Sequence, residues 1–436
     1  MNLFKTYKRY YLNGIDFVMA GLNLFNQKQT GLGNHSHIVL VLDGLLDKNI
    51  LEKRLSKLLS DSLFYNGKIK RAWHLAPYWA PEKQIFQPFD LGFFHLRSPM
   101  DQDLDKLLQN IAISPFKNKT TLLGFDLVHC DNKTYLIMKF NHKMFDARGA
   151  EALLEYILND QDHDKQLLLP CQGPQLNLWK TRFLSGQHIN RFLRSIFIKN
   201  IKVASLKQNN ESGNKHNFFY SSFSKEQTRI IDDLAEKNAG YLMNGIYLLT
   251  CASKSFCSLF NQDKSPGNIL IPINIDIREN KFKKEKIFFN NLSFMLFNLK
   301  KDLPLNKFLI SLKSQFIDQI KKKIPFHFMN AALLMRIMPL SMLARFMNFR
   351  MKKNPCSFSF SYISEQAFNL KSVYGHNVIN LFHMPIVPFD PGIGVFFTRF
   401  NKTLNVIVSS FNTKLSEKDG KSLHKQIVWE VQNGKI

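Results

Sequence analysis

Cysteine is scarce in this sequence and has no regular spacing. The 436 residues include 5 cysteines, namely Cys130, Cys171, Cys251, Cys257 and Cys356. No two of them have the close spacing that zinc sites use, and they form no paired framework of the kind found in small secreted domains. We therefore expect neither a disulfide scaffold nor a metal site, and a reducing cytoplasm as the location.

Long apolar runs are also missing. A membrane-spanning helix needs about 20 predominantly apolar residues, and the best candidate, residues 324–343, is interrupted by Pro325, His327 and Arg336. The basic amino terminus precedes an apolar stretch that contains Asp16 and lacks a small-residue cleavage site. The sequence predicts neither a membrane span nor a signal peptide.

Acidic residues are few compared with basic ones. Asp and Glu number 34 against 59 Lys and Arg, which gives a formal net charge of +25 at pH 7. Such a charge would attract the phosphates of an acyl-CoA, an anionic lipid or a nucleic acid, although a general bias toward lysine explains it without any partner. No signature of a nucleic-acid-binding module is present, so we expect no nucleic-acid partner.

The length exceeds that of one ordinary domain, since domains typically contain roughly 100 to 200 residues. With 45% hydrophobic and 21% charged residues, the chain should fold. Strand and helix patterns recur in both halves, which predicts an α/β protein with two similarly built lobes. The expected division is an N-terminal lobe at 1–165, a connecting segment at 166–215 and a C-terminal lobe at 216–436.

Apolar periodicity places the main elements. We expect strands at 37–42, 122–128, 133–140, 218–223, 268–273, 291–299, 357–363, 394–400 and 403–411. We expect helices at 48–59, after Asp146, at 179–201, after the N-cap Ser224, at 243–259, at 305–322 and from Ser416. The strands at 122–128 and 133–140 should form an antiparallel hairpin, because Asp131 and Asn132 supply turn chemistry between them.

The most informative segment lies at the end of that hairpin and reads Phe-Asn-His-Lys-Met-Phe-Asp-Ala at residues 140–147. His142 follows a buried strand, and Asp146 comes four residues later, just before a helix. A strand end holds a side chain rigidly while leaving it open to a ligand. An imidazole placed there can act as a general base, because its ordinary pKa is about 6.5.

This segment resembles the His-His-x-x-x-Asp-Gly signature of the chloramphenicol acetyltransferase-like superfamily, which includes condensation domains and wax ester synthase/diacylglycerol acyltransferases. Weaker landmarks follow in the family's order over most of the chain: Tyr78-Trp79, Met243-Asn244-Gly245, Ile271-Pro272-Ile273-Asn274, Ser359-Phe360-Ser361-Tyr362, and the approach from Pro385 to Gly394. The resemblance implies two similar lobes, each a mixed sheet flanked by helices. A tunnel between them would admit the acyl donor and the acceptor from opposite faces.

The resemblance also implies roles for individual residues. The second histidine of the signature, the catalytic one, falls on His142. The motif aspartate, Asp146, would be structural and pair with an arginine, for which Arg278 is the candidate. The oxyanion of the reaction intermediate also needs a hydrogen-bond donor, for which our own candidates are Ser361 and Ser359 on the strand expected at 357–363.

Two positions depart from the signature. Asn141 replaces the first histidine, a supporting position where an amide can hydrogen-bond similarly, and Ala147 replaces a glycine that often permits an unusual backbone angle. Three functions stay open: an acyl-CoA-dependent O-acyltransferase, which the weaker landmarks favour; a carrier-protein-dependent condensation-like enzyme; and an acyltransferase-like module that binds without catalysing. No cofactor is expected beyond the thioester co-substrate, carried by coenzyme A or an acyl carrier protein.

Two further patterns have competing interpretations. His35 and His37 have the spacing of a metal pair, but no third ligand is evident, and the alternation of a strand accounts for them. Six methionines between residues 329 and 351 are interleaved with arginines. Core packing explains them, and so does an amphipathic helix that contacts a membrane surface.

Overall fold

The computed structural model describes residues 9–60, 66–81, 91–96, 101–116, 121–159, 178–197, 202–208, 215–265, 267–278, 287–353, 356–364 and 366–434. The helices are α1 (Gly14–Thr30), α2 (Lys48–Ser60), α3 (Asp101–Ile113), α4 (Ala147–Leu158), α5 (Trp179–Phe197), α6 (Lys225–Ala239), α7 (Asn244–Gln262), α8 (Leu305–Lys321), α9 (Ile324–Met335), α10 (Leu340–Lys353) and α11 (Glu417–Asn433). The strands are β1 (Tyr10–Tyr11), β2 (His35–Asp43), β3 (Gly67–Arg71), β4 (Pro77–Pro81), β5 (Leu91–Leu96), β6 (Leu123–Cys130), β7 (Lys133–Asn141), β8 (His216–Ser222), β9 (Asn268–Asp276), β10 (Leu292–Lys300), β11 (Ser359–Ile363), β12 (Ser372–Val373), β13 (His376–Pro385), β14 (Ile393–Phe400) and β15 (Thr403–Phe411).

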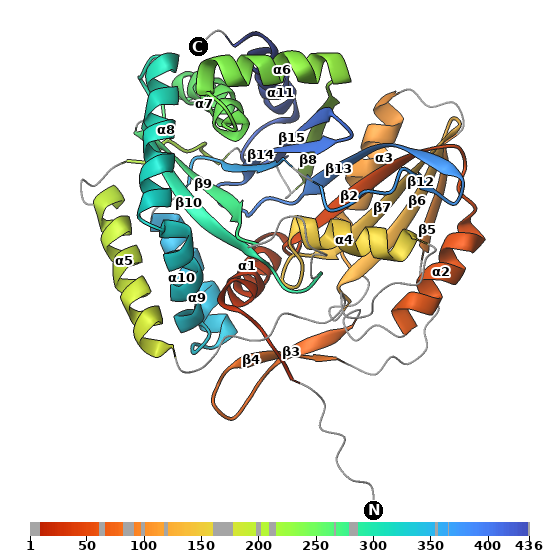
Figure 1. Ribbon diagram of the computed structural model, residues 1–436, viewed down its shortest axis with the longest axis horizontal. Helices are drawn as coiled ribbons and strands as arrows, with labels where there is room; N and C mark the ends of the chain where they lie inside the picture. The colour runs from red at the N-terminus through yellow and green to blue at the C-terminus, as the bar shows by residue number, and fades with distance from the viewer. Residues whose placement is uncertain are drawn as a thin grey trace, which may run out of the picture.

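Two six-stranded sheets form the centres of two lobes (Figure 1). The first has the order β12-β13-β2-β7-β6-β5 and the second has the order β10-β9-β11-β14-β15-β8. Both are mixed, because β5 runs parallel to β6 and β11 runs parallel to β14 among otherwise mainly antiparallel pairs. The expected α/β fold, with two lobes that each contain a mixed sheet flanked by helices, is confirmed.

The first sheet is buried on both faces. In β2, Ile38 and Leu40 pack into the core that contains α2 and α4, whereas Val39 and Val41 face a core shared with α3, β8 and β15. This alternation follows from the two-residue repeat of a strand. The core that contains Val39 and Val41 therefore joins the two lobes, because β8 and β15 belong to the second sheet.

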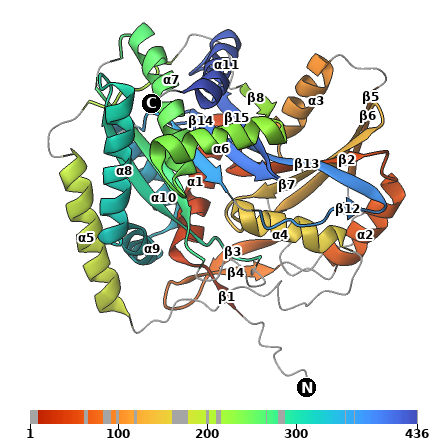
Figure 2. The ribbon, with the colours of Figure 1, turned by 45° about the horizontal axis from the view of Figure 1, so that its top comes forward.

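The second sheet is covered by α6, α7, α8 and α11, which Figures 1 and 2 show on one side of it. The helices α9 and α10 pack against α1, and α5 runs along α9. The helix expected at 179–201 thus exists as α5, and Ser224 caps α6 as predicted, because its side chain accepts from the Gln227 amide.

One strand crosses the division expected from the sequence. β13 pairs antiparallel with β2, from Val378 opposite Leu42 to Pro385 opposite Ser36. A strand from the second half of the chain therefore belongs to the first sheet. The boundaries at 165 and 216 stay predictions, and residues 166–177 of the connecting segment lie outside the described residues.

The elements α1 and β13 are absent from the elements expected from the sequence. The helix α1 begins with a capping box, in which Asn13 accepts from the Asp16 amide and Asp16 accepts from the Asn13 amide. Its apolar residues lie among glycines and polar residues, so its pattern is weak. The predicted hairpin of β6 and β7 is present, with residues paired from Leu123 opposite Phe140 to Cys130 opposite Lys133.

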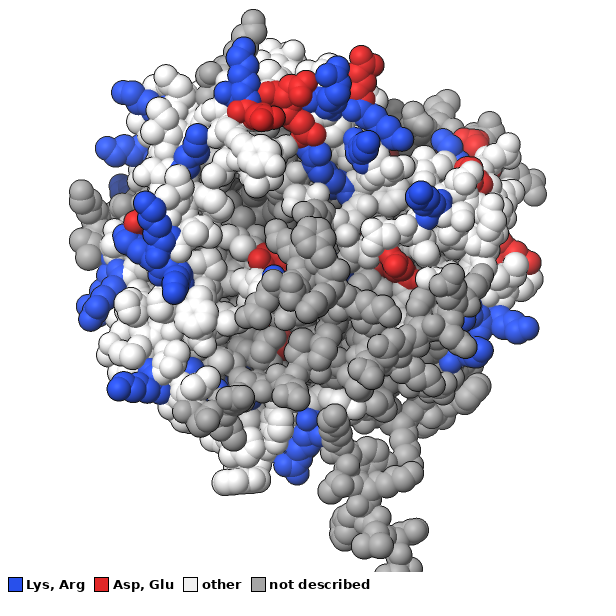
Figure 3. Space-filling model, viewed as in Figure 1, with Lys and Arg blue, Asp and Glu red and all other residues white. Residues whose placement is uncertain are grey.

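The methionine-rich segment forms α9 and α10, and one side of α10 is open to solvent. Met342, Phe346 and Phe349 are exposed on α10 by 56%, 45% and 61%, and Arg345 and Arg350 beside them are exposed as well. Within the described ranges, no helix has an apolar stretch of the length that a bilayer requires. On the face in Figure 3, lysine and arginine side chains are spread around the edges and do not gather in one patch.

Candidate active site

The signature segment forms a tight turn between β7 and α4. The strand ends at Asn141, and the His142 amide donates to Asn34 O at 2.9 Å. The buried Asn141 side chain accepts from the Lys143 amide at 3.1 Å and donates to Asn23 at 3.2 Å. An asparagine at this position therefore fixes the turn that presents His142.

Asn290 sets the orientation of the His142 ring. The side-chain nitrogen of Asn290 donates to Asp16 at 2.9 Å and to His142 O at 3.1 Å. The side-chain oxygen of Asn290 lies 3.2 Å from His142 Nδ1. Because both amide hydrogens already have acceptors, the oxygen must accept from the ring, so Nδ1 carries the hydrogen. The other ring nitrogen, Nε2, then keeps its lone pair, as a general base requires.

Asp16 in turn holds Asn290. This fully buried carboxylate accepts from the Asn290 amide at 2.9 Å, from the Asn290 side chain at 2.9 Å and from the Asn13 amide at 2.8 Å. Burial raises the pKa of Asp16 to about 7, against the lowering effect of these hydrogen bonds. Burial also lowers the pKa of His142, which keeps the ring neutral at pH 7. We call this arrangement the His142–Asn290–Asp16 relay.

Asp146 is fully engaged in structural contacts. It caps α4 by accepting from the Gly149 amide at 2.8 Å, and it accepts from the Asn291 amide at 2.7 Å. Arg278 donates to both of its oxygens, at 2.8 Å and 3.0 Å, and both side chains are buried. The pair of Asp146 and Arg278 that the resemblance implied is therefore present.

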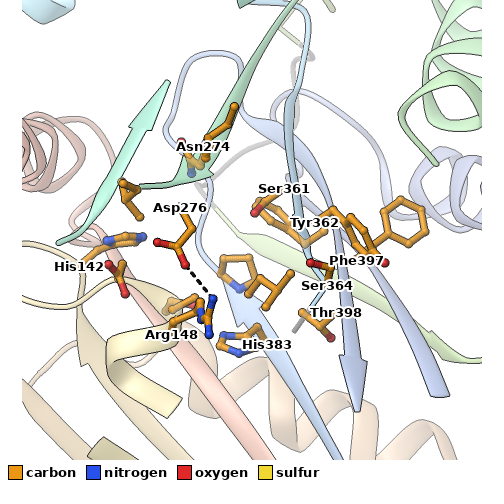
Figure 4. Close-up of a pocket in the computed structure, with 18 of the residues that line it drawn as sticks. His142, Arg148, Asn274, Asp276, Ser361, Tyr362, Ser364, His383, Phe397 and Thr398 are labelled. Atoms are coloured by element: carbon orange, nitrogen blue, oxygen red, sulfur yellow. Dashed lines mark hydrogen bonds and ion pairs between the residues drawn. The ribbon is translucent and has the colours of Figure 1, made fainter. Parts of the chain in front are cut away.

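The ion pair belongs to a longer row of charges. Arg278 also contacts Asp276 at 3.1 Å, and Asp276 accepts from Arg148 at 2.8 Å, the contact dashed in Figure 4. Ala147, the position of the family glycine, is the first residue of α4 and is not among the described residues with positive φ. The missing glycine therefore places no strain on the turn.

A cavity of about 150 Å³ lies between the lobes and reaches His142. Its wall includes Phe140 and His142 from the first lobe, residues 274–276 of β9, residues 361–364 at the end of β11, and His383 of β13. Figure 4 shows His142 on one side of this cavity and Ser361 on another. Ser361 lies on the cavity wall, whereas Ser359 does not line the cavity, and the oxyanion role stays a prediction.

A second cavity, of about 450 Å³, lies within the second lobe. It shares Asn274, Ile275, Tyr362 and Ser364 with the first cavity, and residues of β9 and β11 line both. The strand β11 pairs with β9 only at Phe360 opposite Ile273, so the two strands diverge beyond that point. The landmark residues Met243, Asn244 and Gly245 line this second cavity.

Three histidines lie buried where the sheets meet, and we call His35, His37 and His216 the buried histidine trio. Burial lowers the pKa of His35 and of His216 to about 3, and lowers that of His37 well below its ordinary value. His37 Nδ1 lies 3.1 Å from Met384 O. Among the described residues, no group of histidine, cysteine and acidic side chains has the arrangement of a metal site.

The comparisons with known proteins identify the fold. No protein-family model matches this sequence, and no curated protein is similar to it in sequence. The first condensation domain of the calcium-dependent antibiotic synthetase, solved with a substrate analogue, matches with a TM-score of 0.69 and 9% identity, over 98% of this chain and 96% of that chain. Trichothecene 15-O-acetyltransferase from Fusarium sporotrichioides matches with a TM-score of 0.67 and 11% identity, over 97% of this chain and 94% of that chain.

A third solved structure is the starter condensation domain of rhizomide synthetase, a mutant in complex with C8-CoA. It matches with a TM-score of 0.61 and 9% identity, over 98% of this chain and 94% of that chain. Identities this low establish a common fold and nothing finer. The chain has the fold of condensation domains and chloramphenicol acetyltransferase-like acyltransferases, as its histidine signature predicts.

Proposed function

We propose that this protein transfers an acyl group from a thioester, carried by coenzyme A, to an alcohol or amine, with His142 as the general base. One observation carries the proposal. The hydrogen bond to Asn290 leaves Nε2 of His142 as the available ring nitrogen, and the ring lies on the wall of a cavity between the lobes. A neutral imidazole in that position is ready to accept a proton.

The reaction follows from this geometry. Nε2 of His142 accepts the proton of the acceptor hydroxyl or amine as that group attacks the thioester carbonyl. The new C–O or C–N bond forms, and the carbonyl oxygen becomes an oxyanion, to which the Ser361 hydroxyl donates. When the oxyanion collapses, the C–S bond breaks and the thiolate takes the proton from Nε2. Asn290 accepts from Nδ1 throughout and stabilises the imidazolium.

The second cavity offers a place for the acyl chain. Most of its wall is apolar, including Ile246, Ile273, Met295, Phe297 and Phe316. Because it shares part of its wall with the catalytic cavity, a thioester carbonyl near His142 would leave its chain pointing past Tyr362 into this space. Apolar surface removed from water there stabilises binding by roughly 0.8 kcal/mol for each methylene.

Specific observations favour two alternatives to a coenzyme A-dependent acyltransferase. The condensation-domain fold supports a carrier protein as the donor carrier in place of coenzyme A. The departures at Asn141 and Ala147 support a module that binds without catalysis. Against the second alternative, Asn141 fixes the turn and Ala147 starts a regular helix, so neither departure removes a contact that His142 needs.

Thioester cleavage and acyl transfer test the proposal. The purified protein is offered acyl-CoA thioesters of increasing chain length with alcohol and amine acceptors, and free thiol and acylated product are measured. The wild type should form product, and His142→Ala should lose activity by a factor of about 100 or more. His376→Ala is the matched control, because this half-buried histidine contacts Asp43 O, outside the cavity. Equal rates in the wild type and in His142→Ala would refute the proposal.

A further inference from the structure

A second histidine and carboxylate pair faces the catalytic cavity. His383 on β13 lies with its Nε2 2.7 Å from Oε1 of Glu151 on α4, and both side chains are buried. The other oxygen of Glu151 accepts from the Ala367 amide at 2.7 Å. His383 lines the cavity together with His142, as Figure 4 shows.

The contact with Glu151 determines which nitrogen of His383 is available. A carboxylate only accepts hydrogen bonds, so Nε2 carries the hydrogen and Nδ1 keeps its lone pair. Nδ1 makes no hydrogen bond with any described residue, and the His383 ring lines the cavity. His383 therefore presents Nδ1, whereas His142 presents Nε2.

Two imidazole lone pairs thus face one cavity. A carboxylate behind an imidazole fixes its tautomer and stabilises the imidazolium that forms when the ring accepts a proton. Burial is the main cause of the lowered pKa of His142, and a positive charge on His383 would lower it further. The two rings are therefore suited to successive proton transfers rather than to holding two protons at once.

We propose that His383, held by Glu151, accepts a second proton when the molecule that receives the acyl group is an amine; this inference rests on the proposed acyl transfer. An aliphatic amine enters as an ammonium ion, since its pKa is about 10. His383 Nδ1 takes one proton from the ammonium and releases it to solvent. The neutral amine then attacks the thioester, His142 takes the second proton, the C–N bond forms, the C–S bond breaks and the thiolate leaves as the thiol.

Alcohols and amines differ in the number of protons that they lose on acylation. An alcohol loses one proton on acylation, and His142 alone can take it. An ammonium ion must lose two, and this cavity holds two histidines with available lone pairs. The inference therefore ranks an amine above the alcohol that the resemblance to the wax ester branch favoured.

The test compares a primary amine and an alcohol of the same straight chain, with octanoyl-CoA as the donor. The variant His383→Gln keeps a donor for Glu151 but cannot accept a proton. We expect it to lower kcat/KM for the amine at pH 7 by about 10- to 100-fold and for the alcohol by less than about threefold. The deficit with the amine should shrink as the pH approaches the pKa of the amine, where the free base no longer needs His383. His142→Ala should abolish transfer to both acceptors at every pH.

Several results would overturn the inference and leave acyl transfer standing. They are an equal loss for both acceptors, no loss for the amine, and a wild type that acylates only the alcohol. A wild type that acylates neither would instead refute the proposed function, and this inference with it. If His383→Gln does not fold, ¹⁵N NMR of the wild-type histidines decides: hydrogen on Nε2 of His383 supports the inference, and hydrogen on Nδ1 contradicts it.

Discussion

The substitution Asn290→Leu tests the His142–Asn290–Asp16 relay, because leucine has a similar size and no polar group. It removes three side-chain hydrogen bonds: one to Asp16 at 2.9 Å, one to His142 O at 3.1 Å and one with His142 Nδ1 at 3.2 Å. A hydrogen bond to a charged group contributes about 1.5–3 kcal/mol and a neutral one about 0.5–1.5 kcal/mol. Together these values give an expected fall in the free energy of unfolding of about 2.5–6 kcal/mol.

The kinetic effect should exceed what lost stability explains, because the His142 ring is no longer held in one tautomer. We expect kcat to fall about 10- to 100-fold, which corresponds to about 1.4–2.7 kcal/mol. The Asn290 hydrogen bond raises the pKa of His142, so its removal should lower that pKa further. The acid limb of the kcat/KM profile should therefore move to lower pH.

The assay is release of free thiol from an acyl-CoA in the presence of acceptor, measured across pH at a temperature where the variant is folded. Asn291→Ala is the matched control, since that side chain donates only to Phe289 O at 2.9 Å. Wild-type kcat with an unmoved acid limb in Asn290→Leu would refute the relay. Equal behaviour of the two variants would refute it as well.

Three further predictions concern stability and surface contact. Between about pH 4 and 6 the buried histidine trio stays neutral in the folded state but is protonated when unfolded, whereas folded Asp16 keeps a proton that the unfolded chain has lost. Through these four groups alone the unfolded state binds about two more protons, which contributes a fall in the free energy of unfolding of about 2.7 kcal/mol for each pH unit of acidification, and urea unfolding that shows no loss of this size contradicts this. Arg278→Met leaves the buried Asp146 without its ion pair and should cost about 3–5 kcal/mol by the same method, an unchanged midpoint being the contrary result. We also propose that the exposed side of α10 contacts anionic membranes, so the double variant Phe346→Glu and Phe349→Glu should sediment less with phosphatidylserine vesicles than the wild type, and equal sedimentation would exclude this surface.

Local pattern was sufficient to predict the elements that carry the signature. The apolar runs of β6 and β7 and the turn at Asp131 and Asn132 placed the hairpin, and Asp146 preceded the helix α4. These features depend on neighbours in the sequence, which periodicity and capping chemistry record. The pair of Asp146 and Arg278 could be predicted only because the signature implies an arginine partner.

The other contacts of the site join residues that are far apart in the sequence, so local sequence patterns do not predict them. Asn290 and Asp16 are separated by 274 positions, and His383 and Glu151 by 232. The capping spacing of Asn13 and Asp16 would have revealed the start of α1, but nothing local links that turn to Asn290. The sequence contains one indication of a polar partner for Glu151, which is its position in the apolar stripe of α4. Glu151 is buried there, and a buried carboxylate needs a partner.

The crossing of β13 has a consequence for biosynthesis. During synthesis, residues 35–43 emerge long before residues 376–385, so β2 remains an unprotected edge strand until residues 376–385 have left the ribosome. A nascent chain that ends before residue 376 would expose backbone groups of β2 that invite pairing with other chains. Truncation from the carboxyl end should therefore cause aggregation rather than yield an autonomous amino-terminal half.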